Sequence, residues 1–155
     1  MDQKGFMRAA IERAREGICD GQTPFGACVV KGGRIISCEH NSVWADKDPI
    51  AHAEVNAIRE ACRKLGTIDL SGCVIYSTTE PCPMCFSAIH WAGIGRIVYG
   101  APIAQARRAG FRELSISNRQ MKSLGKSGIR VEGGFMEEGC ESLFSEWKSA
   151  GGKPY

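Results

Sequence analysis

The sequence has no long hydrophobic run, few histidines and little net charge. No stretch of its 155 residues approaches the roughly 18 consecutive apolar residues of a membrane-spanning helix, so we expect no membrane partner. A formal net charge of +3 is too small to indicate nucleic-acid binding by itself. Residues 1–16 alternate charged and small apolar side chains and lack the apolar centre of a secretory signal peptide. We therefore expect a cytoplasmic protein.

A second Cys-x-x-Cys pair is also lacking, although the sequence contains eight cysteines. Disulfides are rare in a reducing cytoplasm, so we expect the thiols to be free or bound to metal. The cysteines outside the single Cys-x-x-Cys pair are predicted to be small buried residues. They are Cys19, Cys28, Cys38, Cys62, Cys73 and Cys140.

Length and composition are those of one globular domain. The sequence is 43% hydrophobic and 24% charged, and no internal repeat or low-complexity linker interrupts residues 1–155. Hydrophobic periodicity and turn residues predict helices at 6–18, 48–65, 82–92, 104–110 and 136–150, and strands at 27–31, 34–38, 73–78, 96–100 and 129–132. This order predicts an α/β fold with a mixed five-stranded sheet between two helical layers.

Two short motifs carry metal-ligand chemistry. His52-Ala53-Glu54 follows Asp48-Pro49, which we interpret as the start of a helix, and Pro81-Cys82-Pro83-Met84-Cys85 follows a predicted strand. One imidazole and two thiolates are ligands that zinc prefers, and three protein ligands leave one tetrahedral position for water. Zinc lowers the pKa of bound water from about 15.7 to about 7, and Glu54 is placed to move its protons. H-x-E followed by P-C-x-x-C is typical of zinc-dependent nucleobase deaminases.

A structural zinc site would instead need a fourth protein ligand. The candidates are Cys38, His40 and His90, and none of them has a spacing that favours this role. A zinc-stabilised binding module without turnover is therefore the non-enzymatic alternative, and it predicts a dispensable Glu54.

These motifs and several other stretches resemble the cytidine deaminase-like zinc superfamily, and within it most of all the bacterial guanine deaminases. The similar stretches are 24–27, Asn41, 48–54, 57–59, 61–62, 80–85, 88–89, 91–92, 109–111 and 153–155. The resemblance implies a three-layer α/β/α fold, a zinc ion and a homodimer that exchanges its C-terminal segment.

The resemblance also implies roles for individual residues. It places Asn41 in hydrogen-bonding contact with a purine, flanked by Phe25 and Trp91, with Tyr155 closing the pocket. Ala53 and Phe111 are further expected substrate contacts. Glu113 would be a second proton carrier, although the family has an aspartate there, so the longer side chain bears on which ring is bound.

We therefore expect hydrolytic deamination of guanine to xanthine and ammonia. The alternative within enzymes is tRNA adenosine deamination, which uses the same zinc site. It is disfavoured because four glutamates lie in the predicted C-terminal helix, whereas binding to phosphates requires basic groups; they are Glu137, Glu138, Glu141 and Glu146. Other aminated rings, namely ammeline, cytosine or a guanine nucleoside, stay open.

Overall fold

A computed structural model describes residues 1–155. Five strands form one mixed sheet in the order β2-β1-β3-β4-β5. They are β1 (Gly26–Lys31), β2 (Arg34–His40), β3 (Cys73–Thr79), β4 (Arg96–Ala101) and β5 (Arg130–Glu132). β1 is antiparallel to β2 and β3, whereas β3, β4 and β5 are parallel to one another. The predicted mixed five-stranded sheet is confirmed.

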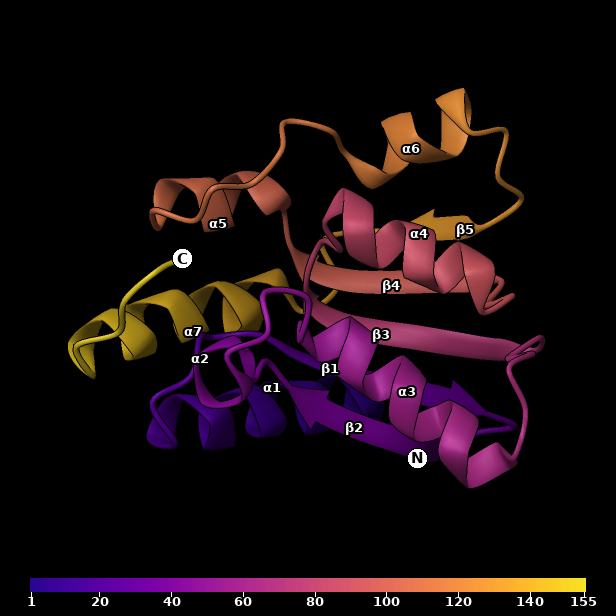
Figure 1. Ribbon diagram of the computed structural model, residues 1–155, viewed down its shortest axis with the longest axis horizontal. Coiled ribbons are helices and arrows are strands. Elements are labelled where there is room, and N and C mark those ends of the chain that lie inside the picture. The colour runs from indigo at the N-terminus through magenta and orange to yellow at the C-terminus, as the bar shows by residue number, and fades with distance from the viewer.

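Helices cover both faces of this sheet, which gives the expected three layers (Figure 1). On one face lie α1 (Gln3–Cys19) and α7 (Glu137–Ser149), and on the other lie α3 (Ala53–Leu65) and α4 (Pro83–Trp91). The shorter helices are α2 (Val43–Asp46), α5 (Ile103–Arg108) and α6 (Asn118–Leu124). None of the helices is long and apolar enough to cross a bilayer.

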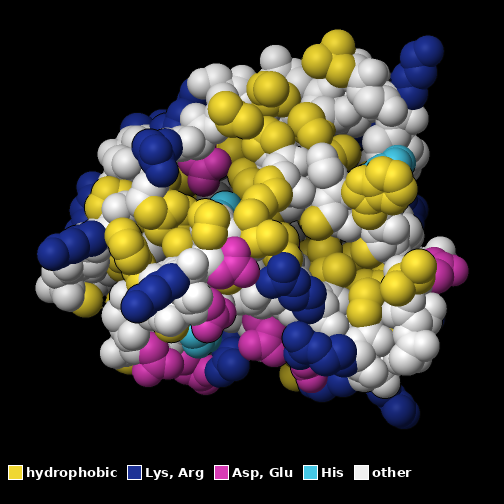
Figure 2. Space-filling view, in the orientation of Figure 1, with side chains coloured by type: hydrophobic (Ala, Val, Ile, Leu, Met, Phe, Trp, Pro, Cys, Tyr) yellow, Lys and Arg dark blue, Asp and Glu magenta, His cyan; other side chains and the backbone are white.

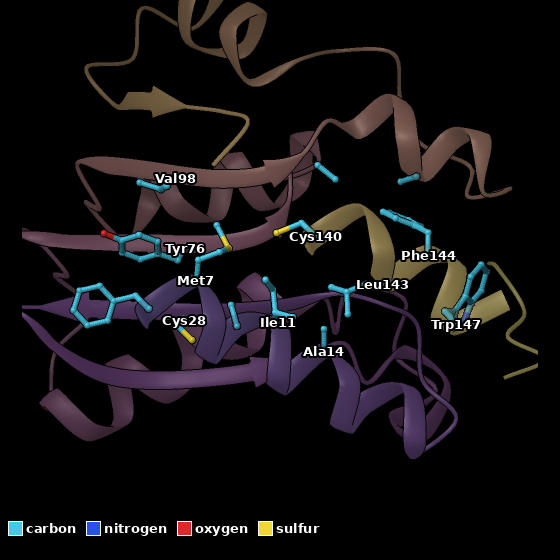
Figure 3. Close-up of a cluster of buried hydrophobic side chains, with 14 of the residues drawn as sticks. Met7, Ile11, Ala14, Cys28, Tyr76, Val98, Cys140, Leu143, Phe144 and Trp147 are labelled. Atoms are coloured by element: carbon cyan, nitrogen blue, oxygen red, sulfur yellow. The ribbon is translucent and has the colours of Figure 1, made fainter. Parts of the chain in front are cut away.

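Each face of the sheet has its own hydrophobic core. Between the sheet and α1 and α7, side chains such as Met7, Tyr76 and Leu143 interdigitate (Figure 3). The second core lies under α3 and α4 and includes Ile75 and Phe86. Strand β3 is buried along nearly its whole length because helices cover both of its faces. It is therefore a rigid support for the residues that follow it.

Local sequence explains the elements that lead to the site. Gly32 and Gly33 both have positive φ angles, 55° and 75°, which allow the tight turn between β1 and β2. Helix α4 begins with Pro83, whose missing N–H has no partner in a first turn anyway.

The start of α3 differs from the prediction. The sequence pattern begins this helix at Asp48, whereas it starts at Ala53 with His52 as the N-cap residue. The Asp48 side chain accepts a hydrogen bond from the backbone N–H of Ile50 at 3.0 Å, and its carbonyl accepts one from Ala51 at 3.1 Å. Asp48 therefore closes a local turn, which is the conformation that competes with its capping role.

The expectation of six free, buried cysteines is wrong for four of them. Cys28 and Cys38 form a disulfide, because the β1–β2 register places them directly opposite each other. Cys19 is exposed and Cys62 is half-buried. The prediction of a buried free thiol is confirmed for the remaining two residues, Cys73 and Cys140.

Candidate functional site

The starts of α3 and α4 bring three metal-ligating side chains together. His52 is the N-cap residue of α3 and Cys82 that of α4, and neither side chain is used to cap its helix. Nδ1 of His52 lies 3.6 Å from Sγ of Cys82 and 3.6 Å from Sγ of Cys85. All three ligand atoms lie within 4.8 Å of one another. The structure thus brings together the three ligands that the sequence motifs indicate.

The donor set fits zinc. With Zn–S of about 2.3 Å and Zn–N of about 2.05 Å, tetrahedral angles give a sulfur–nitrogen separation of about 3.6 Å, which matches the observed distances. No fourth residue joins the cluster. Cys38 is held in the disulfide, His40 contacts the Asn41 carbonyl, and His90 packs beside Trp91. The three candidate fourth ligands therefore lie outside the cluster, as an open zinc site requires.

The two thiols are electrostatically unequal. Hydrogen bonding from Cys85 is the main cause that lowers the pKa of Cys82, to about 4, and the neighbouring His52 lowers it further. The same contact, together with burial, raises the pKa of Cys85 well above its usual value. One thiolate is therefore available before any cation enters, and the helix N-termini favour negative charge there.

Glu54 lies in the first turn of α3, beside the metal ligands. Its carboxylate is 6% exposed and accepts a hydrogen bond from the Ser77 hydroxyl at 3.1 Å. Its other oxygen lies 3.6 Å from Sγ of Cys85. Burial is the main cause that raises the pKa of Glu54 above its usual range. A buried carboxyl with a raised pKa and a fixed orientation is suited to accept and return a proton.

A small cavity of about 20 Å³ lies next to these groups, and it accommodates one water-sized molecule. The residues that line it are Phe25, Asn41, His52, Glu54, Thr79, Glu80, Cys82 and Glu113. A wider hollow of about 320 Å³ shares three of these residues: His52, Cys82 and Glu113. It forms the mouth of the site, and apolar side chains are prominent on this face of the molecule (Figure 2).

Asn41 is fully buried at the end of β2, and both ends of its amide are oriented. Its Oδ1 accepts a hydrogen bond from the backbone N–H of Val43 at 3.1 Å. Its Nδ2 donates to the Tyr155 hydroxyl at 2.6 Å. The first contact fixes which end of the amide is the donor, and the second hydrogen on Nδ2 stays available to a ligand.

The C-terminal segment turns back from α7 towards α5 (Figure 1), and its last residue, Tyr155, lines the mouth. The Tyr155 ring lies 5.3 Å from the Phe111 ring and 5.8 Å from the His52 imidazole, measured between centroids. The backbone N–H of Arg112 donates to the Tyr155 carbonyl at 3.4 Å. Burial raises the pKa of the Tyr155 phenol, so this hydroxyl stays protonated.

Glu113 reaches the cavity from the segment between α5 and α6. Burial is the main cause that raises its pKa, to about 7, and the nearby Cys82 thiolate acts in the same direction. Glu113 and Glu54 are therefore two carboxyls of the cavity whose pKa values burial raises.

Of the other four expected substrate contacts, two line the pocket and two do not. Phe25 lines the cavity, and its ring packs edge-on against Phe111 at 4.9 Å. Phe111 is 5% exposed and lies at the mouth, while Ala53 is fully buried at the start of α3 and lines neither cavity. Trp91 is 85% exposed at the end of α4 and is not brought to the pocket of its own chain.

Two residues of the cavity wall were missed by the sequence reasoning. Thr79 and Glu80 directly precede Pro81-Cys82, and both line the cavity. Their position next to the metal motif was the signal that could have identified them. The Thr79 hydroxyl is buried and has no hydrogen-bond partner in the protein.

Known sequences similar to this chain share one family of zinc-binding deaminases but include two kinds of enzyme, guanine deaminases and tRNA-specific adenosine deaminases. A family model for the cytidine and deoxycytidylate deaminase zinc-binding region matches residues 1–101. A guanine deaminase of Bacillus subtilis is 46% identical over 112 residues, which are 72% of each chain. A tRNA-specific adenosine deaminase of Aquifex aeolicus is 46% identical over 101 residues, 65% of this chain and 67% of that one.

Solved structures are similar over nearly the whole chain. A guanine deaminase from Nitrosomonas europaea superposes with a TM-score of 0.87 at 31% identity, covering 96% of this chain and 85% of that one. Another similar structure holds 8-azaguanine, with a TM-score of 0.86 at 31% identity over 94% of this chain and 84% of that one. The arrangement of His52, Cys82 and Cys85 is the zinc-binding site typical of such proteins.

Proposed function

Because the chain belongs to the cytidine and deoxycytidylate deaminase family, and is thus a zinc-dependent deaminase of a nucleobase or nucleoside, we propose that its substrate is guanine. In this reaction water replaces the exocyclic amino group, so that guanine and water give xanthine and ammonia. The carbon–nitrogen bond to the amino group breaks and a carbon–oxygen bond forms.

The observation that carries this proposal is the position of Tyr155 at the mouth of the pocket. Tyr155 lines the mouth, accepts a hydrogen bond from the buried Asn41 and packs on Phe111. Arg112 is the one arginine or lysine among the residues that line the mouth. A mouth narrowed by an aromatic ring and lined by one cation suits a free base, whereas nucleic acids are bound through several phosphate contacts.

The polar groups of the pocket match a purine edge. The Asn41 amide offers a donor whose orientation is fixed by Val43. The Glu113 carboxyl has a pKa of about 7. Near neutral pH it can therefore accept a hydrogen bond from a ring N–H when ionised, or donate one to a ring nitrogen when protonated. Aromatic rings at Phe25, Phe111 and Tyr155 supply apolar faces beside these groups.

Proton transfer is assigned to Glu54. His52, Cys82 and Cys85 would hold the zinc ion, which would supply the Lewis acidity that makes water nucleophilic near neutral pH. Glu54 is placed to accept a proton from the attacking water, and the Ser77 hydroxyl holds the carboxylate in place. Glu54 then donates the proton to a ring nitrogen and assists the departure of ammonia, help that is typically worth 10²–10⁴ in rate.

A second candidate, tRNA adenosine deamination, is favoured by the tRNA-specific relatives. Against it stand the acidic residues of α7, which include Glu137, Glu138, Glu141 and Glu146. The basic residues of α5 and α6, Arg107, Arg108, Arg119 and Lys122, lie outside both cavities. Ammeline, cytosine and a guanine nucleoside would be deaminated by the same chemistry. Which of these rings is accepted depends on how the Glu113 side chain, longer than the aspartate of the family, contacts the ring.

The test is ammonia release by the zinc-loaded protein from guanine, cytosine, ammeline, guanosine and a tRNA anticodon stem-loop. We expect the highest kcat/KM with guanine. Preference for the stem-loop would replace guanine by the tRNA candidate. No release from any substrate, with zinc bound and Glu54→Ala unchanged in stability, would favour the binding module.

We also propose that residues 1–155 act as one domain and assemble as a homodimer. In the structure the C-terminal segment lies on its own chain, where Trp44 donates to the Lys153 carbonyl at 3.2 Å. Exchange of this segment would place the same contacts between two protomers. A cysteine pair at positions 44 and 153 would distinguish the two arrangements, because it would link one chain to itself or two chains to each other.

A further inference from the structure

Glu80 is a buried carboxylate whose hydrogen bonds reach two helices. It follows β3 directly, is 6% exposed, and precedes the metal ligand Cys82 by two residues. One oxygen accepts from the backbone N–H of Ile103 at 3.1 Å, and the other accepts from the backbone N–H of Asn118 at 2.8 Å. A buried carboxylate requires such partners, and here both oxygens are used.

The two partner amides begin α5 and α6. Pro102, the N-cap residue of α5, has no capping hydrogen bond of its own, so the Glu80 carboxylate performs that function. Between these helices runs the segment 109–117, which carries Phe111 and Glu113. A single side chain thus holds the helices on both sides of the segment that delivers Glu113 to the cavity.

Two further hydrogen bonds connect residues 80–81 to α6 and to the end of β4. The Asn118 side chain donates from Nδ2 to the Pro81 carbonyl at 2.5 Å, and Asn118 is fully buried. The backbone N–H of Glu80 donates to the Ala101 carbonyl at 2.8 Å, just before α5. Residues 80–81, which lead into the zinc ligands, are therefore fastened to both ends of the Glu113 segment.

We propose that Glu80 is a positioning residue that sets the distance between the Glu113 segment and the metal side of the pocket. Glu80 lines the small cavity, but both of its carboxylate oxygens accept from helix amides, so it acts on the reaction through the segment that carries Glu113 and Phe111. The readouts in activity rest on the deaminase function proposed above. Displacement of a reacting group by about 1 Å costs on the order of 10²-fold in rate, which sets the scale of the expected effect.

The matched substitution is Glu80→Gln, which keeps the volume but replaces one acceptor oxygen by an NH2 group. One of the two helix amides then faces a donor. We expect zinc content to stay at the wild-type level, kcat/KM to fall between about tenfold and 10²-fold, and hydrogen exchange to accelerate at the Ile103 and Asn118 amides and in 109–113.

A double-mutant cycle with Glu113→Gln separates positioning from general loss of stability. If Glu80 acts through Glu113, the double variant has nearly the activity of Glu113→Gln alone, within about threefold. A purely structural role would make the two losses multiply. Multiplicative losses, or wild-type kcat/KM in folded, zinc-containing Glu80→Gln, would overturn the proposal.

Two further variants serve as a stability control and as a substitute for Glu80→Gln. Ser117→Ala removes the side-chain cap of α6, which accepts from the Gln120 N–H at 3.2 Å, and leaves the Glu80 contacts intact. It should lower the melting temperature while kcat/KM stays within threefold of wild type. If Glu80→Gln does not fold, Asn118→Ala, which deletes only the contact to Pro81, should show the same coupling to Glu113.

Failure of the proposed deaminase function can be distinguished from failure of the Glu80 proposal. A wild-type protein without ammonia release from any base would refute the deaminase assignment. The exchange rates of 109–113 in Glu80→Gln still decide the present proposal in that case, because unchanged rates would show that Glu80 does not hold this segment.

Discussion

Replacing Tyr155 with phenylalanine removes one hydroxyl from the mouth of the pocket and keeps the ring. The hydroxyl accepts a hydrogen bond from Asn41 Nδ2 at 2.6 Å. Asn41 stays oriented in this variant, because its Oδ1 still accepts from the backbone N–H of Val43. We therefore expect a small loss of stability and a small change in activity.

The magnitude follows from one hydrogen bond. A net loss of about 1 kcal/mol lowers the melting temperature of a domain of this size by roughly 2–4 °C. The same energy corresponds to about a fivefold change in kcat/KM. Thermal unfolding followed by circular dichroism and ammonia release over a range of guanine concentrations would measure the two effects.

Tyr155→Ala removes the ring as well. The ring packs on Phe111 at 5.3 Å and on Trp44 at 6.2 Å, and each aromatic pair contributes about 0.5–1.5 kcal/mol. Together with the hydrogen bond, the loss is about 3 kcal/mol. Because an aromatic wall of the mouth is lost, kcat/KM should fall more than about tenfold, mostly through KM. If Tyr155→Phe were as damaging as Tyr155→Ala, the reasoning that the ring, and not the hydroxyl, is the part of Tyr155 that matters at the mouth would be refuted.

Three other substitutions test the pocket and the fold. Asn41→Ala should raise KM for guanine and lower the free energy of unfolding by about 1–3 kcal/mol, since the buried Val43 amide loses its acceptor; urea unfolding checks the second effect. Thr79→Val should leave stability unchanged or slightly higher, because the hydroxyl has no partner in the protein, and lower kcat/KM about fivefold if that hydroxyl binds the ligand; equal activity would exclude this contact. Arg15 lowers the pKa of Glu146, so their contribution is fully present above the unfolded-state pKa and is lost as the pH falls through the folded-state value. Glu146→Gln should therefore cost less than about 1 kcal/mol at pH 7, in keeping with a half-exposed pair, and the difference from wild type in urea unfolding should shrink below about pH 4.

The metal cluster was the part of the site that the sequence predicted best. Its chemistry is local: Cys82 and Cys85 are three residues apart at a helix start, and His52 and Glu54 are two apart at another. Such spacings determine which side chains share one end of a helix, whatever the rest of the chain does.

Boundaries and contacts between distant segments were predicted less well. The helix start moved from Asp48 to Ala53, because an aspartate before proline forms either a cap or a turn and the choice depends on the surroundings. Helix α6 was missed, although Ser117 and Gln120 form a capping box that the sequence displays.

The strand register and the residues that line the pocket could be determined only from the folded chain. The Cys28–Cys38 pair follows from the pairing of β1 with β2, which includes an irregularity between Val29 and Val30 that no residue pattern predicts. Trp91 was expected in the pocket only by resemblance, and within one chain it lies on the surface. Glu80 is recognisable as a bridge between α5 and α6 only once both helices are in place.

The ligands His52 and Cys82 come from two helices that are separated by strand β3 in the chain. A bound ion therefore acts as a cross-link between α3 and α4, and it stabilises the native state by mass action. Once free zinc exceeds its dissociation constant, each tenfold increase adds about 1.4 kcal/mol to the free energy of unfolding. The melting temperature of this protein would consequently report the zinc supply of the solution around it.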